Sequence, residues 1–74
     1  MLDDIIEIIC EYVEVEPETI TEDSSLRGDI GATSFDLMNI AVAVEEKYGV
    51  SVTNRELLKI KTVGDVERVL TARG

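Results

Sequence analysis

Hydrophobic residues recur with helical spacing at the beginning of the chain. The hydrophobic positions there follow i, i+3, i+4, i+7 spacing, and they are Leu2, Ile5, Ile6, Ile9 and Val13. Acidic residues fill most of the positions between them, so one side is hydrophobic and the other is charged. This pattern predicts an amphipathic helix over residues 3–15.

A second helix is predicted from Ser34 to Tyr48. Thr33 is followed by Asp36 with the spacing of a capping box, and Gly49 stands where a helix commonly ends. The positions with core-facing spacing on this helix are Leu37, Ile40, Ala41, Val44 and Tyr48.

The same helix carries a second hydrophobic strip on a different side. Phe35, Met38 and Val42 are spaced i, i+3, i+7 and are rotated away from the core-facing positions. A helix in a bundle needs only one hydrophobic face to reach the core, so this strip requires another explanation. Either the preceding loop covers it or a partner protein binds to it.

Two shorter helices are predicted in the last third of the chain. Thr53 and Glu56 have capping-box spacing before a short helix near residues 54–59. Thr62 and Asp65 have the same spacing before a last helix over residues 63–72. The inner stripe of this last helix is predicted to be Val63, Val66, Val69 and Leu70.

Residues 16–32 lack helical spacing and form a long predicted connection. Pro17 stops the first helix, and serine and glycine residues interrupt the rest of the segment. Ile20, Leu26 and Ile30 are spaced as anchors that would tie the segment to a core. We therefore expect an ordered loop.

The predicted elements fit a single all-α domain over residues 1–74. We expect a small four-helix bundle of three main helices and one short helix, with a long first loop. The N-terminus MLDDIIEII is acidic where a signal peptide would be basic, and no stretch has the length of a transmembrane span. These features predict a cytoplasmic protein, and we expect it to be a monomer.

The formal charge of −9 is unevenly distributed. Residues 1–46 contain 13 acidic residues and a single basic one, Arg27, whereas residues 47–74 contain 3 acidic and 6 basic residues. A field of this sign repels nucleic acid and anionic lipid and attracts basic protein surfaces. The same charges also serve to keep a small domain in solution.

The residue types argue against a self-contained active site. The chain has no histidine, so neither Ser34 nor Cys10 has an imidazole base and a zinc cluster is not expected. Cys10 cannot form an internal disulfide and is interpreted as a small, buried or half-buried hydrophobic residue rather than a reactive thiol. Chemistry at Ser34 would require activation by another protein. We predict no catalytic residue and no metal site.

The stretch GDIGATSFDLMNIAVAVEEKYGVSV resembles the acyl carrier proteins around their Gly-x-Asp-Ser-Leu signature. The resemblance extends over nearly the whole chain, from the acidic first helix to KIKTVGDVERVL in the last. It implies that Ser34 accepts 4′-phosphopantetheine from coenzyme A through a phosphopantetheinyl transferase. The thiol of that arm would then carry acyl groups as thioesters.

The resemblance also implies a docking surface on the second helix. Acyl-processing or acyl-loading enzymes with basic surfaces would bind there. The residues assigned to partner contact are Thr33, Phe35, Asp36, Met38, Val42, Glu45 and Glu46.

Several positions differ from the family pattern. Thr33 replaces the aspartate before the serine, Phe35 replaces the leucine after it, Asn39 replaces a common glutamate, and Lys47 interrupts the acidic end of the helix. These differences favour a specialised fatty-acid or polyketide-type pathway. Two alternatives remain open: a peptidyl or D-alanyl carrier loaded by an adenylating enzyme, and an unmodified helical adaptor.

Overall fold

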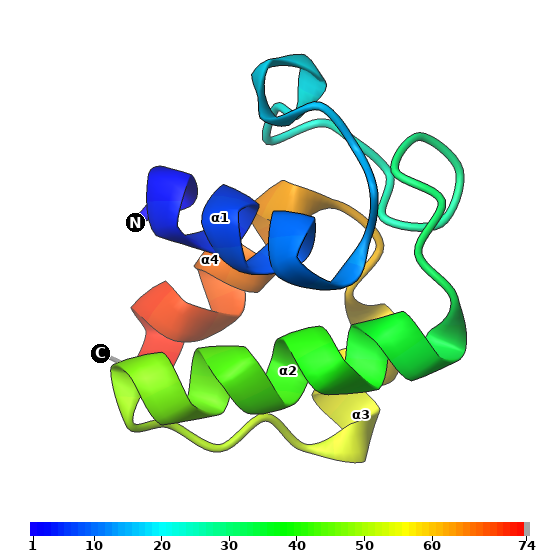
Figure 1. Ribbon diagram of the computed structural model, residues 1–74. Coiled ribbons are helices and arrows are strands. Elements are labelled where there is room, and N and C mark those ends of the chain that lie inside the picture. Colours follow the sequence, from blue (N-terminus) through cyan, green and yellow to red (C-terminus); the bar gives the residue numbers. More distant parts are fainter. Residues whose placement is uncertain (74) are drawn as a thin grey trace.

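The computed structural model describes residues 1–73, which form four α-helices and one short 3-10 helix (Figure 1). The elements are α1 Leu2–Tyr12, η1 Pro17–Thr19, α2 Ser34–Tyr48, α3 Asn54–Lys59 and α4 Val63–Arg73. Among the described residues, β-pairing is limited to one isolated bridge between Ser25 and Thr62. The prediction of an all-α fold with one short helix and a long first loop is confirmed.

Helix α1 packs against both α2 and α4 (Figure 1). Because it contacts two helices, its buried face is wider than the predicted stripe. Ile5 and Ile9 are fully buried as expected, and Ile8 is buried although it lies outside that stripe. Leu2 and Ile6 are only partly buried at the margin of the core.

Helix α1 ends at Tyr12, so the predicted end at residue 15 is wrong. Val13 has an extended backbone with φ −130° and ψ 135°. Val13 and Val15 are β-branched, which disfavours the helix, and both pack partly against the core from the extended chain. Pro17 imposes an extended backbone on Glu16, at ψ 120°, and then begins η1, which was not predicted.

The long loop is ordered and belongs to the core. Its three predicted anchors, Ile20, Leu26 and Ile30, are all buried, and Ala32 is buried with them. Gly31, at φ +84°, reverses the chain between Ile30 and Ala32 so that both can face inward. The remaining buried hydrophobic residues are Ile5, Ile8, Ile9, Leu37, Ile40, Val44, Val63, Val66 and Leu70.

Backbone hydrogen bonds tie this loop to the connection between α3 and α4. The N–H of Leu26 donates to the carbonyl of Lys61 at 2.9 Å. The N–H of Val63 donates to the carbonyl of Ser24 at 3.1 Å, and the N–H of Gly64 donates to that of Glu22 at 2.9 Å. The loop is therefore held at several points by a segment far away in the sequence.

The predicted ranges of α2 and α3 are confirmed, and α4 starts as predicted but extends one residue further, to Arg73. Thr53 and Glu56 form a capping box at the start of α3, as their spacing indicated. The N–H of Asp65 donates to Thr62 Oγ1 at 3.2 Å at the start of α4. Gly49 ends α2 in the left-handed conformation at φ +66°, which glycine adopts without steric cost.

Candidate functional site

Ser34 is the first residue of α2, and the capping of that helix does not use its hydroxyl. Thr33 Oγ1 accepts the N–H of Asp36 at 3.1 Å, and Asp36 Oδ2 accepts the N–H of Thr33 at 2.9 Å. These two bonds satisfy backbone donors that the first turn of a helix leaves unpaired. The side chain of Ser34 is consequently free to face solvent, and the residue is exposed.

One side chain does contact the Ser34 hydroxyl. Arg27 Nη2 donates a hydrogen bond to Ser34 Oγ at 2.8 Å, and both residues are exposed. The predicted site did not include Arg27, although it is the sole basic residue among the first 46. That isolation in an acidic segment was the signal that could have identified it.

The contact between Arg27 and Ser34 does not make the serine a nucleophile. A guanidinium carries donors only and stays protonated in proteins, so it cannot take the proton from Oγ. The chain contains no histidine that could do so. Neither Arg27 nor a histidine of this chain therefore activates Ser34 as a nucleophile.

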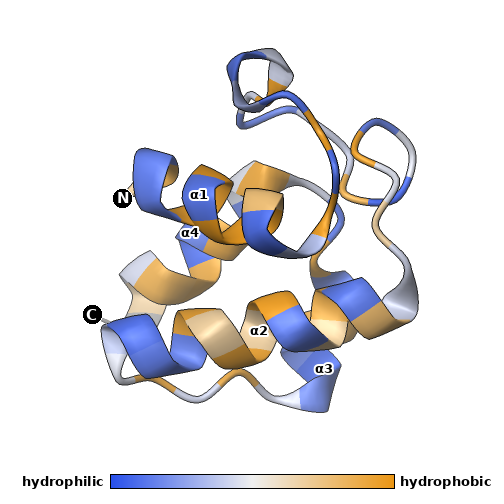
Figure 2. Cartoon of the chain, viewed as in Figure 1, coloured by the Kyte–Doolittle hydropathy of each residue, from blue (hydrophilic) through white to orange (hydrophobic). Residues whose placement is uncertain are grey.

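The second hydrophobic strip of α2 faces solvent. Phe35 is 72% exposed, Met38 59% and Val42 51%. The long loop thus does not cover the strip, which excludes one of the two explanations for it. Figure 2 shows hydrophobic and hydrophilic positions interleaved along α2. On the opposite side of the helix, Leu37, Ile40 and Val44 are buried, while Ala41 and Tyr48 are only partly buried.

The acidic residues predicted at this surface have different environments. Asp36 is partly buried because its carboxylate belongs to the capping box. Glu45 is also partly buried, and its Oε2 accepts the N–H of Val52 at 2.6 Å, which links α2 to the segment before α3. Glu46 is exposed. Glu46 therefore presents its charge to solvent most fully, and the carboxylate of Glu45 is partly engaged inside the molecule.

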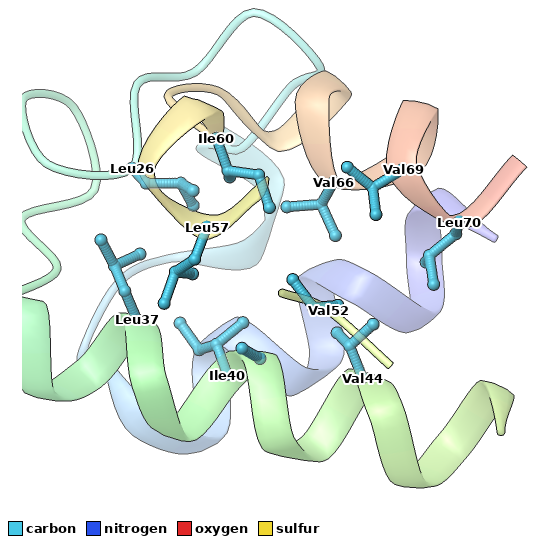
Figure 3. A pocket seen from close by; sticks show the side chains of 11 residues that line it. Leu26, Leu37, Ile40, Val44, Val52, Leu57, Ile60, Val66, Val69 and Leu70 are labelled. Carbon is cyan, nitrogen blue, oxygen red and sulfur yellow. The ribbon is translucent and has the colours of Figure 1, made fainter. Parts of the chain in front are cut away.

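A small hydrophobic cavity lies between α2, α3 and α4 (Figure 3). Its volume is about 20 Å³, roughly the space of one water molecule. Leu37, one turn after Ser34, and Leu26, beside Arg27, point into its end nearest the serine. Every lining residue is hydrophobic, and the others are Ile40, Ala41, Val44, Val52, Leu57, Ile60, Val66, Val69 and Leu70.

Cys10 lies outside this site. Its side chain is half-buried, and Sγ donates to the carbonyl of Val15 at 3.6 Å. Burial raises the pKa of the Cys10 thiol, and the nearby Glu16 and Glu18 raise it further. The thiol is therefore protonated at neutral pH, which fits the interpretation of Cys10 as a small hydrophobic residue.

The part of the chain that the structure describes offers neither a metal site nor a membrane-spanning helix. Residues 1–73 contain no group of three or more side chains placed to hold a metal ion. None of the helices in that range has the length and hydrophobicity needed to cross a membrane.

Comparison with known proteins gives a consistent result. The family described as phosphopantetheine attachment site matches residues 3–70. The acyl carrier protein of Wolinella succinogenes is 40% identical over 70 residues, covering 95% of this chain and 92% of the relative. That of a Sulfurovum species is 35% identical over 65 residues, covering 88% and 87%.

A solved structure supports the same fold. The acyl carrier protein from Enterococcus faecalis superposes with a TM-score of 0.83 at 22% identity, covering 99% of this chain and 92% of that one. The match of the family to most of the chain, together with relatives at 40% and 35% identity, establishes the class of the protein. The chain belongs to the acyl carrier proteins, a family of carriers rather than catalysts that hold 4′-phosphopantetheine covalently.

Proposed function

We propose that Ser34 is the residue to which 4′-phosphopantetheine is attached. The observation that supports this most directly is its exposed hydroxyl at the first position of α2, where Thr33 and Asp36 already perform the capping. The contact with Arg27 leaves the oxygen accessible at the surface. The matched family segment, residues 3–70, contains this serine.

In the proposed reaction, Ser34 Oγ forms a bond to the phosphorus that carries the pantetheine of coenzyme A. The phosphoanhydride bond breaks, 3′,5′-ADP leaves, and a base of the transferase takes the serine proton. Once attached, the arm supplies a thiol that carries acyl groups as thioesters. The protein itself contributes the presentation of the hydroxyl.

We further propose that partner enzymes dock on the exposed strip of α2. Phe35, Met38 and Val42 supply hydrophobic contact area, and the exposed Glu46 supplies an acidic margin. Such a surface is complementary to a partner with a hydrophobic patch edged by basic residues. Thr33, Asp36 and Glu45 lie next to the strip, and their proposed contribution is smaller because Asp36 and Glu45 already accept backbone hydrogen bonds.

The cargo we propose is a hydrophobic acyl group of a specialised fatty-acid or polyketide-type pathway. The cavity that begins one turn from Ser34 is lined by hydrophobic side chains alone. At about 20 Å³ the cavity is too small for any cargo as it stands, so an acyl group would have to widen it. The surface that such a group would meet is entirely hydrophobic, which suits an acyl chain better than a charged aminoacyl group.

The decisive experiment is the intact mass of the protein before and after incubation with coenzyme A and a broad-specificity transferase. We expect a gain of one phosphopantetheine group that is lost in Ser34→Ala. Ser51→Ala removes another exposed serine and should load normally. The circular dichroism spectrum of Ser34→Ala should match the wild type. A Ser34→Ala variant that still loads would refute the site, and no loading by any transferase would favour the unmodified adaptor.

A further inference from the structure

We propose that Arg27 is a positioning residue that binds the phosphodiester joining the arm to Ser34. The proposal rests on attachment at Ser34, and its starting point is the 2.8 Å hydrogen bond from Arg27 Nη2 to Ser34 Oγ. Attachment turns this hydroxyl into an ester oxygen of a negatively charged group. A guanidinium that touches the oxygen before attachment is then next to the new negative charge.

The geometry makes the contact stronger after attachment. The two anionic oxygens of a phosphodiester are bonded to the same phosphorus as the ester oxygen, so they lie within reach of a donor that already contacts Oγ. Arginine presents several N–H groups in a planar fork, which suits two phosphate oxygens at once. One hydrogen bond to a neutral hydroxyl is thereby replaced by charge-assisted bonds to an anion.

The backbone around Arg27 is fixed before the arm is attached. Ser25 Oγ accepts the N–H of Gly28 at 3.0 Å, and Asp29 Oδ2 accepts the N–H of Ser25 at 2.8 Å. The preceding residue, Leu26, is buried and bonded to the carbonyl of Lys61. Only the side chain of Arg27 must therefore be ordered on binding the phosphate, which reduces the entropic cost.

A second cation lies close to the same position. Arg27 and Lys61 line one surface depression of about 260 Å³ together with Ser25 and Ile60. The depression is open to solvent, and its two charged residues are both basic. It is a suitable place for the anionic end of the arm, with Arg27 as the residue in contact with the attachment oxygen.

The charge distribution indicates that Arg27 compensates the negative charge that attachment adds. Attachment adds a negative charge to a segment that already contains 13 acidic residues and one basic residue. Without a cation at the attachment point, that charge would increase the repulsion within the first half of the chain. With Arg27 in place, attachment converts a weak contact into an ion pair. Arg27 should therefore decide how much the arm stabilises the fold.

The test compares the melting temperatures of the apo and phosphopantetheine-loaded forms of the wild type, Arg27→Gln and Arg55→Gln. Arg55→Gln makes the same change at an exposed arginine in the first turn of α3. We expect the loaded-minus-apo difference to be about 2–4 °C more positive in the wild type and in Arg55→Gln than in Arg27→Gln, as an exposed ion pair allows. About 1 M salt should remove the effect, because it screens exposed charges.

Intact mass measured first separates this proposal from the attachment site itself. Wild-type protein that never loads refutes both. Loading with equal loaded-minus-apo differences in the wild type and Arg27→Gln refutes the role of Arg27 alone.

A second measurement needs no loaded variant. In wild-type protein, the guanidinium protons of Arg27 should exchange with water more slowly after loading, while those of Arg55 stay unchanged. Arg27→Gln in the apo form assigns the resonance. Unchanged exchange at Arg27 on loading would overturn the proposal. This holds even if the transferase does not modify Arg27→Gln, because the measurement uses loaded wild-type protein.

Discussion

Replacing Asp65 by asparagine should weaken the fold in a way that depends on pH. The carboxylate of Asp65 holds the connection between α3 and α4, where Oδ2 accepts the N–H of Lys61 at 2.9 Å and of Thr62 at 3.0 Å. Oδ1 accepts a hydrogen bond from Arg68. This connection also anchors the loop that contains Arg27, so the substitution tests the support of the site.

The magnitude can be worked out from the pKa of Asp65. The N–H of Lys61, then Arg68 and the N–H of Thr62, lower this pKa from 3.8 to about 2. The folded form therefore prefers the ionised carboxylate, and the stabilisation is present above pH 4 and lost as the pH falls through about 2. A shift of this size is worth about 2 kcal/mol at neutral pH. The Asp65 side chain is only 24% exposed, so solvent screens it modestly.

Urea unfolding followed by circular dichroism provides the assay, from about pH 7 to about pH 2. The free-energy difference between the wild type and Asp65→Asn should decrease by about 2 kcal/mol over this range, with roughly half of the decrease complete near pH 3. Asp23→Asn changes an exposed loop carboxylate and should follow the wild type throughout. A difference between the wild type and Asp65→Asn that stays constant with pH would refute the reasoning.

Four further substitutions test other parts of the structure. Gly49→Ala should lower the free energy of unfolding by about 1 kcal/mol, because the residue is left-handed at φ +66°. An added Cβ would meet no atom within 4 Å, so the cost comes from the backbone conformation alone. An unchanged urea midpoint would contradict this. Ile9→Ala should cost about 2–5 kcal/mol because its side chain is fully buried, whereas Met38→Ala should change stability by less than about 0.5 kcal/mol. Met38→Ala should instead slow turnover of the loaded protein by a partner enzyme, and a comparable loss of stability would make the strip structural. Thr33→Asp keeps a capping side chain and adds a charge, so it should speed loading measured by intact mass; an equal rate would show that the missing carboxylate is unimportant.

The sequence predicted the helices best where local rules decide. The starts of α2, α3 and α4 depend on residue pairs three apart, and their hydrogen bonds form within one turn. The end of α1 was placed too late because Val13 continues the hydrophobic spacing while adopting an extended backbone. Hydrophobic spacing alone cannot distinguish a helical residue from an extended one at this position, since both conformations bring the side chain to the core.

The sequence predicted the part of the candidate site that local helical geometry determines. The exposed position of Phe35, Met38 and Val42 is explained by helical geometry and a second face that the core does not use. The contact of Arg27 with Ser34 was missed because it depends on the course of an irregular loop. The bond from the N–H of Val52 to Glu45 was missed because it depends on the path of the chain after α2.

The bonds between the loop and the start of α4 also affect the order in which the protein folds. Residues 22–26 pair with residues 61–64, so these contacts close a large part of the chain. Contacts between distant residues carry a cost in loop entropy and form later than the turns of a helix. During synthesis, the segment containing Arg27 can dock only after residue 64 has left the ribosome. We therefore expect a chain truncated before residue 61 to present Ser34 at the start of α2, next to a loop that lacks these supporting bonds.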